Sequence, residues 1–192
     1  MDATNRGWTL FTAVAVAAAA LDLVTKRIAF DRLGMPGTGP AWPIVPGIFV
    51  FETNLNEGAL FGVGQGLGLV FAAVSVAAIL GIVAMMARRE TRADGWLVLA
   101  LGLIVGGIVG NLYDRLGLPG LVWHAPPARE GLPVSAVRDW IHVTVPGVID
   151  WPIFNLADSW LVVGAGILLL LTLRRPEQPA STSPTASPGE TP

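Results

Sequence analysis

Residues 95–113 read GWLVLALGLIVGGIVGNLY, an apolar segment that contains no charged side chain. A bilayer core is about 30 Å thick, and a helix needs about 20 apolar residues to cross it. Three other segments have a similar length and composition, at about residues 8–25, 67–87 and 154–173. The sequence therefore predicts four transmembrane helices.

The composition of the whole chain agrees with a membrane protein. Hydrophobic residues make up 53% and charged residues 14% of 192 positions, which is too apolar for an ordinary soluble domain. The apolar spacing shows neither strict alternation nor a one-sided helical stripe, which favours helices surrounded by lipid over a β-barrel. Residues 48–54 have strand-like composition. The expected fold is all-α, with four transmembrane helices and a small β-like element on the extracytoplasmic surface.

The remaining composition limits the function and the domain organisation. A net charge of −2 without a basic cluster gives no footprint for nucleic acid, and the lack of cysteine excludes disulfides and cysteine nucleophiles. His124 and His142 lack the spacing of a metal site and are expected in loops. We expect one membrane domain over residues 1–175, monomeric and without metal or cofactor, an exposed insertion over residues 116–136, and a disordered cytoplasmic tail over residues 176–192.

The distribution of basic residues predicts the orientation in the membrane. Arginines concentrate between the second and third spans and after the fourth, at Arg88, Arg89, Arg92, Arg174 and Arg175. Both places are expected in the cytoplasm, so both termini lie inside, and Arg6 agrees. Lys26, Arg27 and Arg32 after the first span argue the other way. The first span also resembles a cleavable signal peptide, but Asp22 and Lys26 follow it without a turn-rich stretch, which favours a retained helix.

Polar side chains gather at one predicted face of the bundle. In an up-and-down arrangement the end of span one, the start of two, the end of three and the start of four share the extracytoplasmic face. The residues at those places are Asp22, Asn56, Asn111, Asp114, Arg115, Asn155 and Asp158, and Asp139 lies in the loop between spans three and four on the same side. Carboxylates near hydrocarbon are costly, and their convergence with amides is typical of a site at a membrane surface.

Each of these polar groups also has a purely structural interpretation. Asn155 is a candidate N-cap of the fourth span, with Asp158 as the acid of a capping box. Asp114 and Arg115 are candidates for an interfacial ion pair or a loop anchor. The glycines of span three, Gly102, Gly106, Gly107 and Gly110, predict close packing against neighbouring helices.

Five sequence blocks resemble the bacterial lipoprotein signal peptidases (signal peptidase II). The blocks are Asp22-Leu-Val-Thr-Lys26, Asn56-Glu-Gly-Ala-Leu-Phe61, Gly106-Gly-Ile-Val-Gly-Asn-Leu-Tyr-Asp-Arg115, Val137-Arg-Asp-Trp-Ile141 and Phe154-Asn-Leu-Ala-Asp158. The resemblance implies a membrane aspartic endopeptidase that removes signal peptides from diacylglyceryl-modified prolipoproteins, cutting before the lipidated cysteine.

The resemblance also assigns residues. It implies that Asp139 and Asp158 are the catalytic pair. The supporting or substrate-binding residues that carry over are Asp22, Lys26, Asn56, Gly58, Asn111, Asp114, Arg115 and Asn155, with Glu57 and Trp140 as further contacts. The chain departs from the family pattern in two places, a longer connection before Asp139 and Arg138 where a valine is common. Asp114 and Asp150 are therefore alternatives to Asp139, although the spacing to Asp158 and the following Trp-Ile favour Asp139.

Two neighbouring carboxylates fit this chemistry because they hold one proton between them over a broad pH range. One then acts as a base on water and the other as an acid toward the scissile carbonyl.

A small proton or ion transporter subunit is an alternative function, but the middle of every span is uncharged. A presenilin-like protease would need a Gly-x-Gly-Asp block, which this chain lacks. A relative that binds lipoprotein precursors without cutting them is a further alternative.

Overall fold

The computed structural model describes residues 3–58, 64 and 66–174. Four of its helices are long and apolar enough to cross a membrane: α1 (Ala3–Leu33), α2 (Gly68–Met86), α4 (Gly95–Arg115) and α5 (Leu156–Leu173). A short helix, α3 (Arg89–Ala93), joins α2 to α4. The four predicted spans are confirmed, and the predicted tail over residues 176–192 lies outside the described residues.

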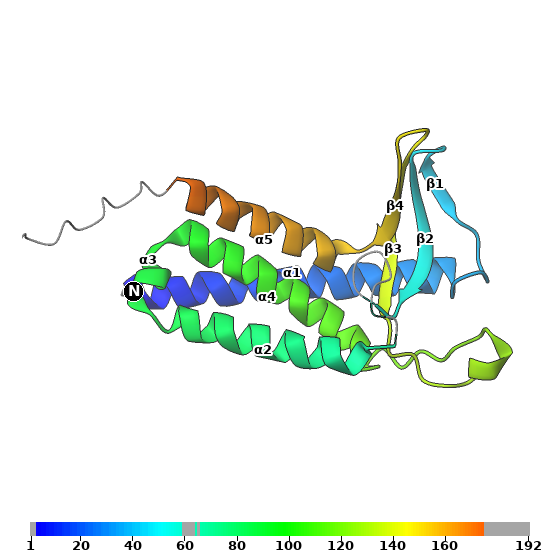
Figure 1. The fold of residues 1–192 in the computed structure, drawn as a ribbon, viewed down its shortest axis with the longest axis horizontal. Helices are drawn as coiled ribbons and strands as arrows, with labels where there is room; N and C mark the ends of the chain where they lie inside the picture. The colour runs from blue at the N-terminus through cyan, green and yellow to red at the C-terminus, as the bar shows by residue number, and fades with distance from the viewer. Residues whose placement is uncertain (1–2, 59–63, 65, 175–192) are drawn as a thin grey trace, which may run out of the picture.

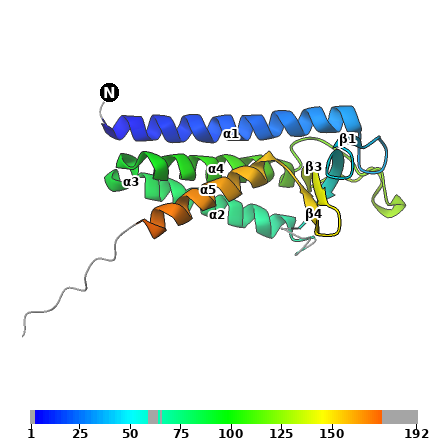
Figure 2. The same ribbon diagram turned by 90° about the horizontal axis from the view of Figure 1, so that it is seen from above.

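The helices run side by side along the long axis of the molecule (Figure 1). The central helix is α4, which contacts α1, α5 and α2. Figure 2 shows α1 along one side of α4, with α2 and α5 on the other. The first predicted span ends at about Thr25, and the helix that contains it, α1, continues to Leu33. The last span was expected to begin near Phe154, and its helix begins at Leu156, directly after the strand that Phe154 ends.

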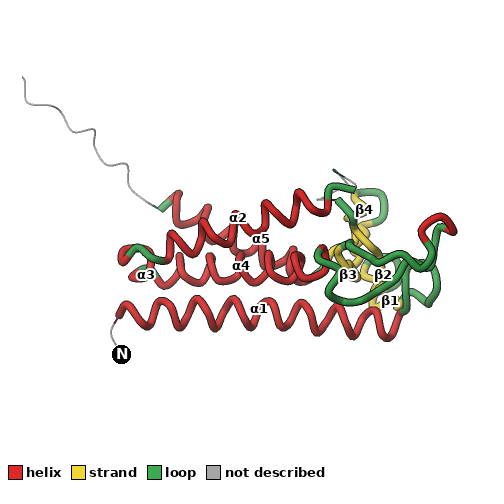
Figure 3. The backbone as a smooth tube through the Cα atoms, turned by 90° about the horizontal axis from the view of Figure 1, so that it is seen from below, coloured by secondary structure: helices red, strands yellow, loops and turns green. Residues whose placement is uncertain are grey.

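A four-stranded antiparallel sheet covers one end of the bundle (Figure 3). Its strands, in spatial order, are β1 (Trp42–Val45), β2 (Phe49–Asn56), β3 (Val137–Val145) and β4 (Ile149–Phe154). The fold is therefore not strictly all-α, and the predicted small β element is a complete sheet. Asp139 was expected in a loop but lies on β3, opposite Asn54 of β2.

Two similar turns close the hairpins of this sheet. Each contains a Pro-Gly pair, with Gly47 and Gly147 at positive φ, the conformation that glycine adopts without strain. The amide of Ile48 donates to the carbonyl of Val45 at 3.0 Å, and the amide of Val148 donates to that of Val145 at 2.9 Å. The two hairpins meet where β3 pairs with β2, and this pairing places Asp139 and Asn56 at the end of the bundle.

The glycines of α4 allow the helices to approach closely, as predicted. A methyl group at Gly106 would collide with Ala18 of α1, and one at Gly107 would collide with the backbone of Ala157 in α5. At Gly110 the added carbon would collide with the carboxylate of Asp22. The small residues of α4 therefore bring α1 and α5 together around the acidic groups.

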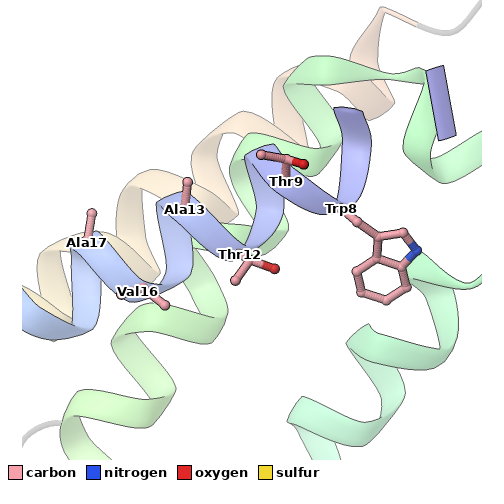
Figure 4. Close-up of a pocket in the computed structure, with 6 residues that line it drawn as sticks. All are labelled: Trp8, Thr9, Thr12, Ala13, Val16 and Ala17. Atoms are coloured by element: carbon pink, nitrogen blue, oxygen red, sulfur yellow. The ribbon is translucent and has the colours of Figure 1, made fainter. Parts of the chain in front are cut away.

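An open hollow lies on α1, away from these acids (Figure 4). It is lined by Trp8, Thr9, Thr12, Ala13, Val16 and Ala17. These residues precede Asp22 on the same helix, toward the end of the bundle opposite the sheet. The polar cluster is separate from this hollow.

Candidate active site

The start of α5 is built around Asn155. Its side-chain oxygen accepts from the amide of Asp158 at 3.0 Å, and the Asp158 carboxylate accepts from the Asn155 amide at 3.3 Å. This is the predicted capping box. The cap leaves the Asn155 side-chain NH₂ available, and it donates to Asp139 Oδ1 at 2.6 Å and to Asn111 Oδ1 at 3.2 Å. Asn155 therefore forms the predicted cap and also contacts Asp139.

Asp139 and Asp158 belong to one hydrogen-bonded network. Asn111 Nδ2 donates to Asp158 Oδ1 at 2.9 Å, so the two acids are connected through Asn155 and Asn111. Asp139 is buried, and its Oδ2 has no hydrogen-bond partner among the residues that the structure describes. Asp158 is half-buried. Asp139 therefore contributes a buried carboxylate oxygen without a hydrogen-bond partner to this network.

The environment of Asp139 favours its neutral form. Burial raises the pKa of Asp139 to about 8, with a further contribution from the negative charge of Asp158. Asn155, Lys26 and Asn56 act in the opposite direction and lower this pKa. A carboxyl that keeps its proton near neutral pH beside a second carboxyl is the arrangement expected of an acid and a base in one site.

A buried group of charged side chains contacts this network through Asn111. Lys26 Nζ lies 2.8 Å from Asp22 Oδ2 and 3.2 Å from Asp114 Oδ2, and it donates to Asn111 Oδ1 at 2.8 Å. Asp22 Oδ1 accepts from the amide of Ala157 at 2.9 Å, which ties α5 to α1. Because Lys26 and Asn155 both donate to Asn111 Oδ1, the Asn111 NH₂ group is directed toward Asp158.

Asp114 pairs with Arg138, which corrects the expected ion pair with Arg115. Arg138 donates to Asp114 Oδ1 from Nη2 at 2.8 Å and from Nε at 3.0 Å, and its backbone amide donates to Oδ2 at 3.0 Å. Asp22 and Asp114 are thus matched by Lys26 and Arg138, all four side chains being buried. The group contains two acidic and two basic side chains, so their formal charges cancel.

The segment Asn56–Gly58 lies on the other side of Asp139. Asn56 is the last residue of β2, and its side-chain oxygen accepts from the amide of Gly58 at 3.0 Å. Arg115 Nη2 donates to the Gly58 carbonyl at 3.3 Å, and the Arg115 guanidinium is within electrostatic reach of Asp139 and Asp158. The segment therefore contacts Arg115 through the Gly58 carbonyl.

Two further expected contacts, Glu57 and Trp140, face away from the acids. Glu57 forms an ion pair with Arg129, and the Trp140 ring packs against Phe51 with centroids 4.9 Å apart. The structure therefore gives both side chains partners outside the network of Asp139.

The comparisons with known proteins agree with this arrangement. A family model described as signal peptidase (SPase) II matches residues 14–174. The chain belongs to the signal peptidase II family. Members of this family are peptidases of the aspartic type, and the four apolar helices make this member a multi-pass membrane protein.

Individual relatives and structures give the same result. The lipoprotein signal peptidase of Rhodopirellula baltica is 47% identical over 166 residues, covering 85% of this chain and 71% of the relative. The lipoprotein signal peptidase of Bacillus subtilis strain 168 is 32% identical over 164 residues, covering 85% of this chain and 93% of the relative. A bacterial membrane enzyme solved in meso at 2.3 Å has a TM-score of 0.69 and 24% identity, covering 85% of this chain and 87% of its own; it shares the fold.

The structure separates Asp139 from the two alternative acids that the signal peptidase II pattern left open. Asp114 is fully buried between Lys26 and Arg138. Asp150 lies on β4 with its side chain 74% exposed, and its carboxylate bonds His142 at 2.7 Å. Of the three, Asp139 is the one that joins Asp158 through Asn155. Its catalytic role stays a prediction.

Sequence reasoning missed two contact groups in this member of the family. His142, expected in a loop, lies on β3 between Glu52 of β2 and Asp150 of β4. Burial lowers the pKa of His142, but the two carboxylates outweigh it and the pKa is raised. Alternation of residues along β3 would have signalled the strand; nothing in the sequence signals that Arg129 reaches Glu57.

Proposed function

We propose that this protein removes signal peptides from diacylglyceryl-modified prolipoproteins and cuts before the lipidated cysteine. Membership of the signal peptidase II family and the names of its relatives support this substrate. The observation that carries the proposal is the connection of Asp139 to Asp158 through two asparagines at one end of four apolar helices. A transporter would require polar groups through the depth of the bilayer.

In the proposed mechanism Asp158 is the base and Asp139 is the acid. Asp158 accepts hydrogen bonds from the Asn155 amide and from Asn111, which orient its carboxylate, while Asp139 retains a proton at neutral pH. Asp158 takes a proton from water as the water oxygen attacks the scissile carbonyl carbon. Asp139 hydrogen-bonds the carbonyl oxygen through the otherwise unpartnered Oδ2.

The tetrahedral intermediate then collapses. The proton held by Asp158 passes to the amide nitrogen as the carbon–nitrogen bond breaks, and Asp139 again holds its own proton. The two products are a free carboxylate on the signal peptide and a free amine on the lipidated cysteine. No covalent enzyme intermediate is formed.

The supporting residues act on the two acids from both sides. We assign Lys26, Asp22, Asp114 and Arg138 to the buried group of charges that orients Asn111 toward Asp158. Asn155 forms hydrogen bonds with both acids, and Asn56 lowers the pKa of Asp139. Arg115 and the Gly58 carbonyl form the edge at which the substrate backbone enters.

The orientation follows from the arginines at the end of the bundle opposite the sheet. Figure 1 places α3, which carries Arg89 and Arg92, beside the N-terminus and far from the sheet. The positive-inside bias supports a cytoplasmic location for that end, with both termini inside and the acids at the extracytoplasmic face. We propose that the protein acts as a monomer with one membrane domain over residues 1–175.

The test is cleavage of a purified diacylglyceryl-modified prolipoprotein by the purified protein in detergent, followed by mass spectrometry of both products. We expect one cut, immediately before the lipidated cysteine. The same precursor without the lipid serves as the control and should be cut far more slowly. Equal cleavage of both precursors would contradict the substrate assignment, and binding of the precursor without cleavage would favour the non-catalytic relative.

A further inference from the structure

The inserted segment over residues 116–136 is a folded arm. Its two sides are joined by backbone hydrogen bonds, from the amide of Trp123 to the carbonyl of Leu132 and from the amide of Val134 to that of Leu121, both at 2.9 Å. Val134 and Ala136 at its base are buried against the end of α1. In Figure 1 the arm extends past the sheet at the end of the bundle. The arm therefore has a defined structure attached to the core.

Arg129 at the end of this arm holds Glu57. Its Nη1 and Nη2 donate to the two Glu57 carboxylate oxygens, each at 2.7 Å. The guanidinium carbon lies 3.9 Å from the centroid of the Trp123 ring, on the opposite side of the arm. This paired geometry is the strong form of an arginine–carboxylate contact, and stacking on Trp123 limits the conformations of the guanidinium. The contact holds the pKa of Glu57 below its usual range.

Glu57 is flanked by the two residues that face Asp139 and Arg115. Asn56 of β2 lies opposite Val137 of β3, two residues before Asp139, and the Gly58 carbonyl accepts from Arg115 at 3.3 Å. The Asn56 side chain and the Gly58 amide are bonded to each other. A force that holds Glu57 in place therefore also holds this segment against the acid.

We propose that Arg129 is a positioning residue, which fixes the segment Asn56–Gly58 beside Asp139 by holding Glu57. This inference rests on the proposed function and deepens it, because it gives the inserted arm a role in the same site. The ion pair is partly exposed, with Glu57 26% and Arg129 37% accessible, so it can be broken without disturbing the buried group. The arm acts on the reaction through Asn56.

The opposite charges of Glu57 and Arg129 make the test specific. Arg129→Gln removes a positive charge near Asp139 and Glu57→Gln removes a negative one, so direct electrostatic effects on Asp139 have opposite signs. Loss of positioning has the same sign in both variants, since either change releases Asn56. In both, Asp139 then keeps its proton to higher pH, and the alkaline limb of the pH profile moves upward.

The experiment measures kcat, KM and the pH profile for wild type, Arg129→Gln, Glu57→Gln and the double variant, with hydrogen exchange of residues 56–58. We expect kcat to fall by about fivefold in each single variant, the size of one well-formed partly exposed pair, with KM within about twofold. The double variant should be no worse than either single one, and exchange should rise in all three. Arg27→Gln is the matched control, because Arg27 pairs with Asp31 at 3.4 Å with the Arg27 side chain 80% exposed.

The outcomes separate this inference from the proposed function. If wild type cuts and the single variants match it, or shift the pH profile in opposite directions, the positioning role is wrong while the function stands. If wild type does not cut, the proposed function fails, and hydrogen exchange of residues 56–58 decides whether Arg129 anchors this segment. Raised exchange of residues 56–58 in both variants then upholds the anchoring, and unchanged exchange overturns it.

Discussion

Replacing Arg138 with leucine is expected to destabilise the protein by about 3 kcal/mol. Arg138 donates two side-chain hydrogen bonds to the buried Asp114, at 2.8 and 3.0 Å. Breaking a buried ion pair on one side costs about 3–5 kcal/mol, because the other charge is left without its partner. Asp114 would keep Lys26 at 3.2 Å and the backbone amide of residue 138, which places the loss at the lower end of that range. Leucine retains apolar contact near Phe30, whose ring centre lies 6.0 Å from the guanidinium.

The assay is equilibrium unfolding in mixed micelles of dodecyl maltoside and sodium dodecyl sulfate, followed by tryptophan fluorescence. The double variant Asp114→Asn with Arg138→Leu removes both charges and should recover about 1–2 kcal/mol relative to Arg138→Leu alone. Arg27→Leu, at an exposed pair, should stay within about 0.5 kcal/mol of wild type. A loss below about 1 kcal/mol for Arg138→Leu, or a double variant less stable than the single one, would refute the view that Arg138 neutralises Asp114.

Three other predictions follow from the same geometry. Gly110→Ala should destabilise the protein by about 2 kcal/mol in the same unfolding assay, because the methyl group meets a carboxylate, whereas Gly166→Ala, with open space around it, should stay within about 1 kcal/mol. In a series of buffers, kcat/KM should fall on the alkaline side with an apparent pKa near 8 as Asp139 loses its proton, and a flat profile from pH 6 to 10 would count against its role as the acid. His142→Gln should lower stability most at acidic pH, since the raised pKa of His142 contributes stability that is present below about pH 6.5 and lost as the pH rises through the folded value; an equal loss at pH 9 would contradict this.

The membrane helices were predictable because each is a local pattern. An apolar segment of sufficient length identifies a span wherever it packs, and the glycines of α4 signal close packing without naming the partner. The cap at Asn155 is local too, since it joins residues three positions apart. The extension of α1 to Leu33 was missed because Lys26 appeared to end the apolar run. In the structure Lys26 is buried beside Asp22, one helical turn earlier, so the charge does not end the helix.

The contacts that organise the site are not local, and the sequence leaves them open. Asp114 could pair with its neighbour Arg115 or with a distant cation, and only the return of the chain along β3 brings Arg138 to it. The pairing of Glu57 with Arg129 depends on the fold of the inserted arm in the same way. The spacing to Asp158 and the following Trp-Ile favoured Asp139 over Asp150, but the exposure of Asp150 is a property of the sheet.

The most direct test of the account compares three aspartate variants in the cleavage of a diacylglyceryl-modified prolipoprotein. Asp139→Asn and Asp158→Asn should each lower kcat by at least about 10³-fold, because each removes one side of the acid–base pair. Asp150→Asn is the matched control on the same sheet and should retain cleavage near the wild-type rate, with the folded state of each variant checked by its unfolding curve. Full activity in Asp139→Asn or Asp158→Asn, or loss of activity in a folded Asp150→Asn, would contradict the assignment of the pair.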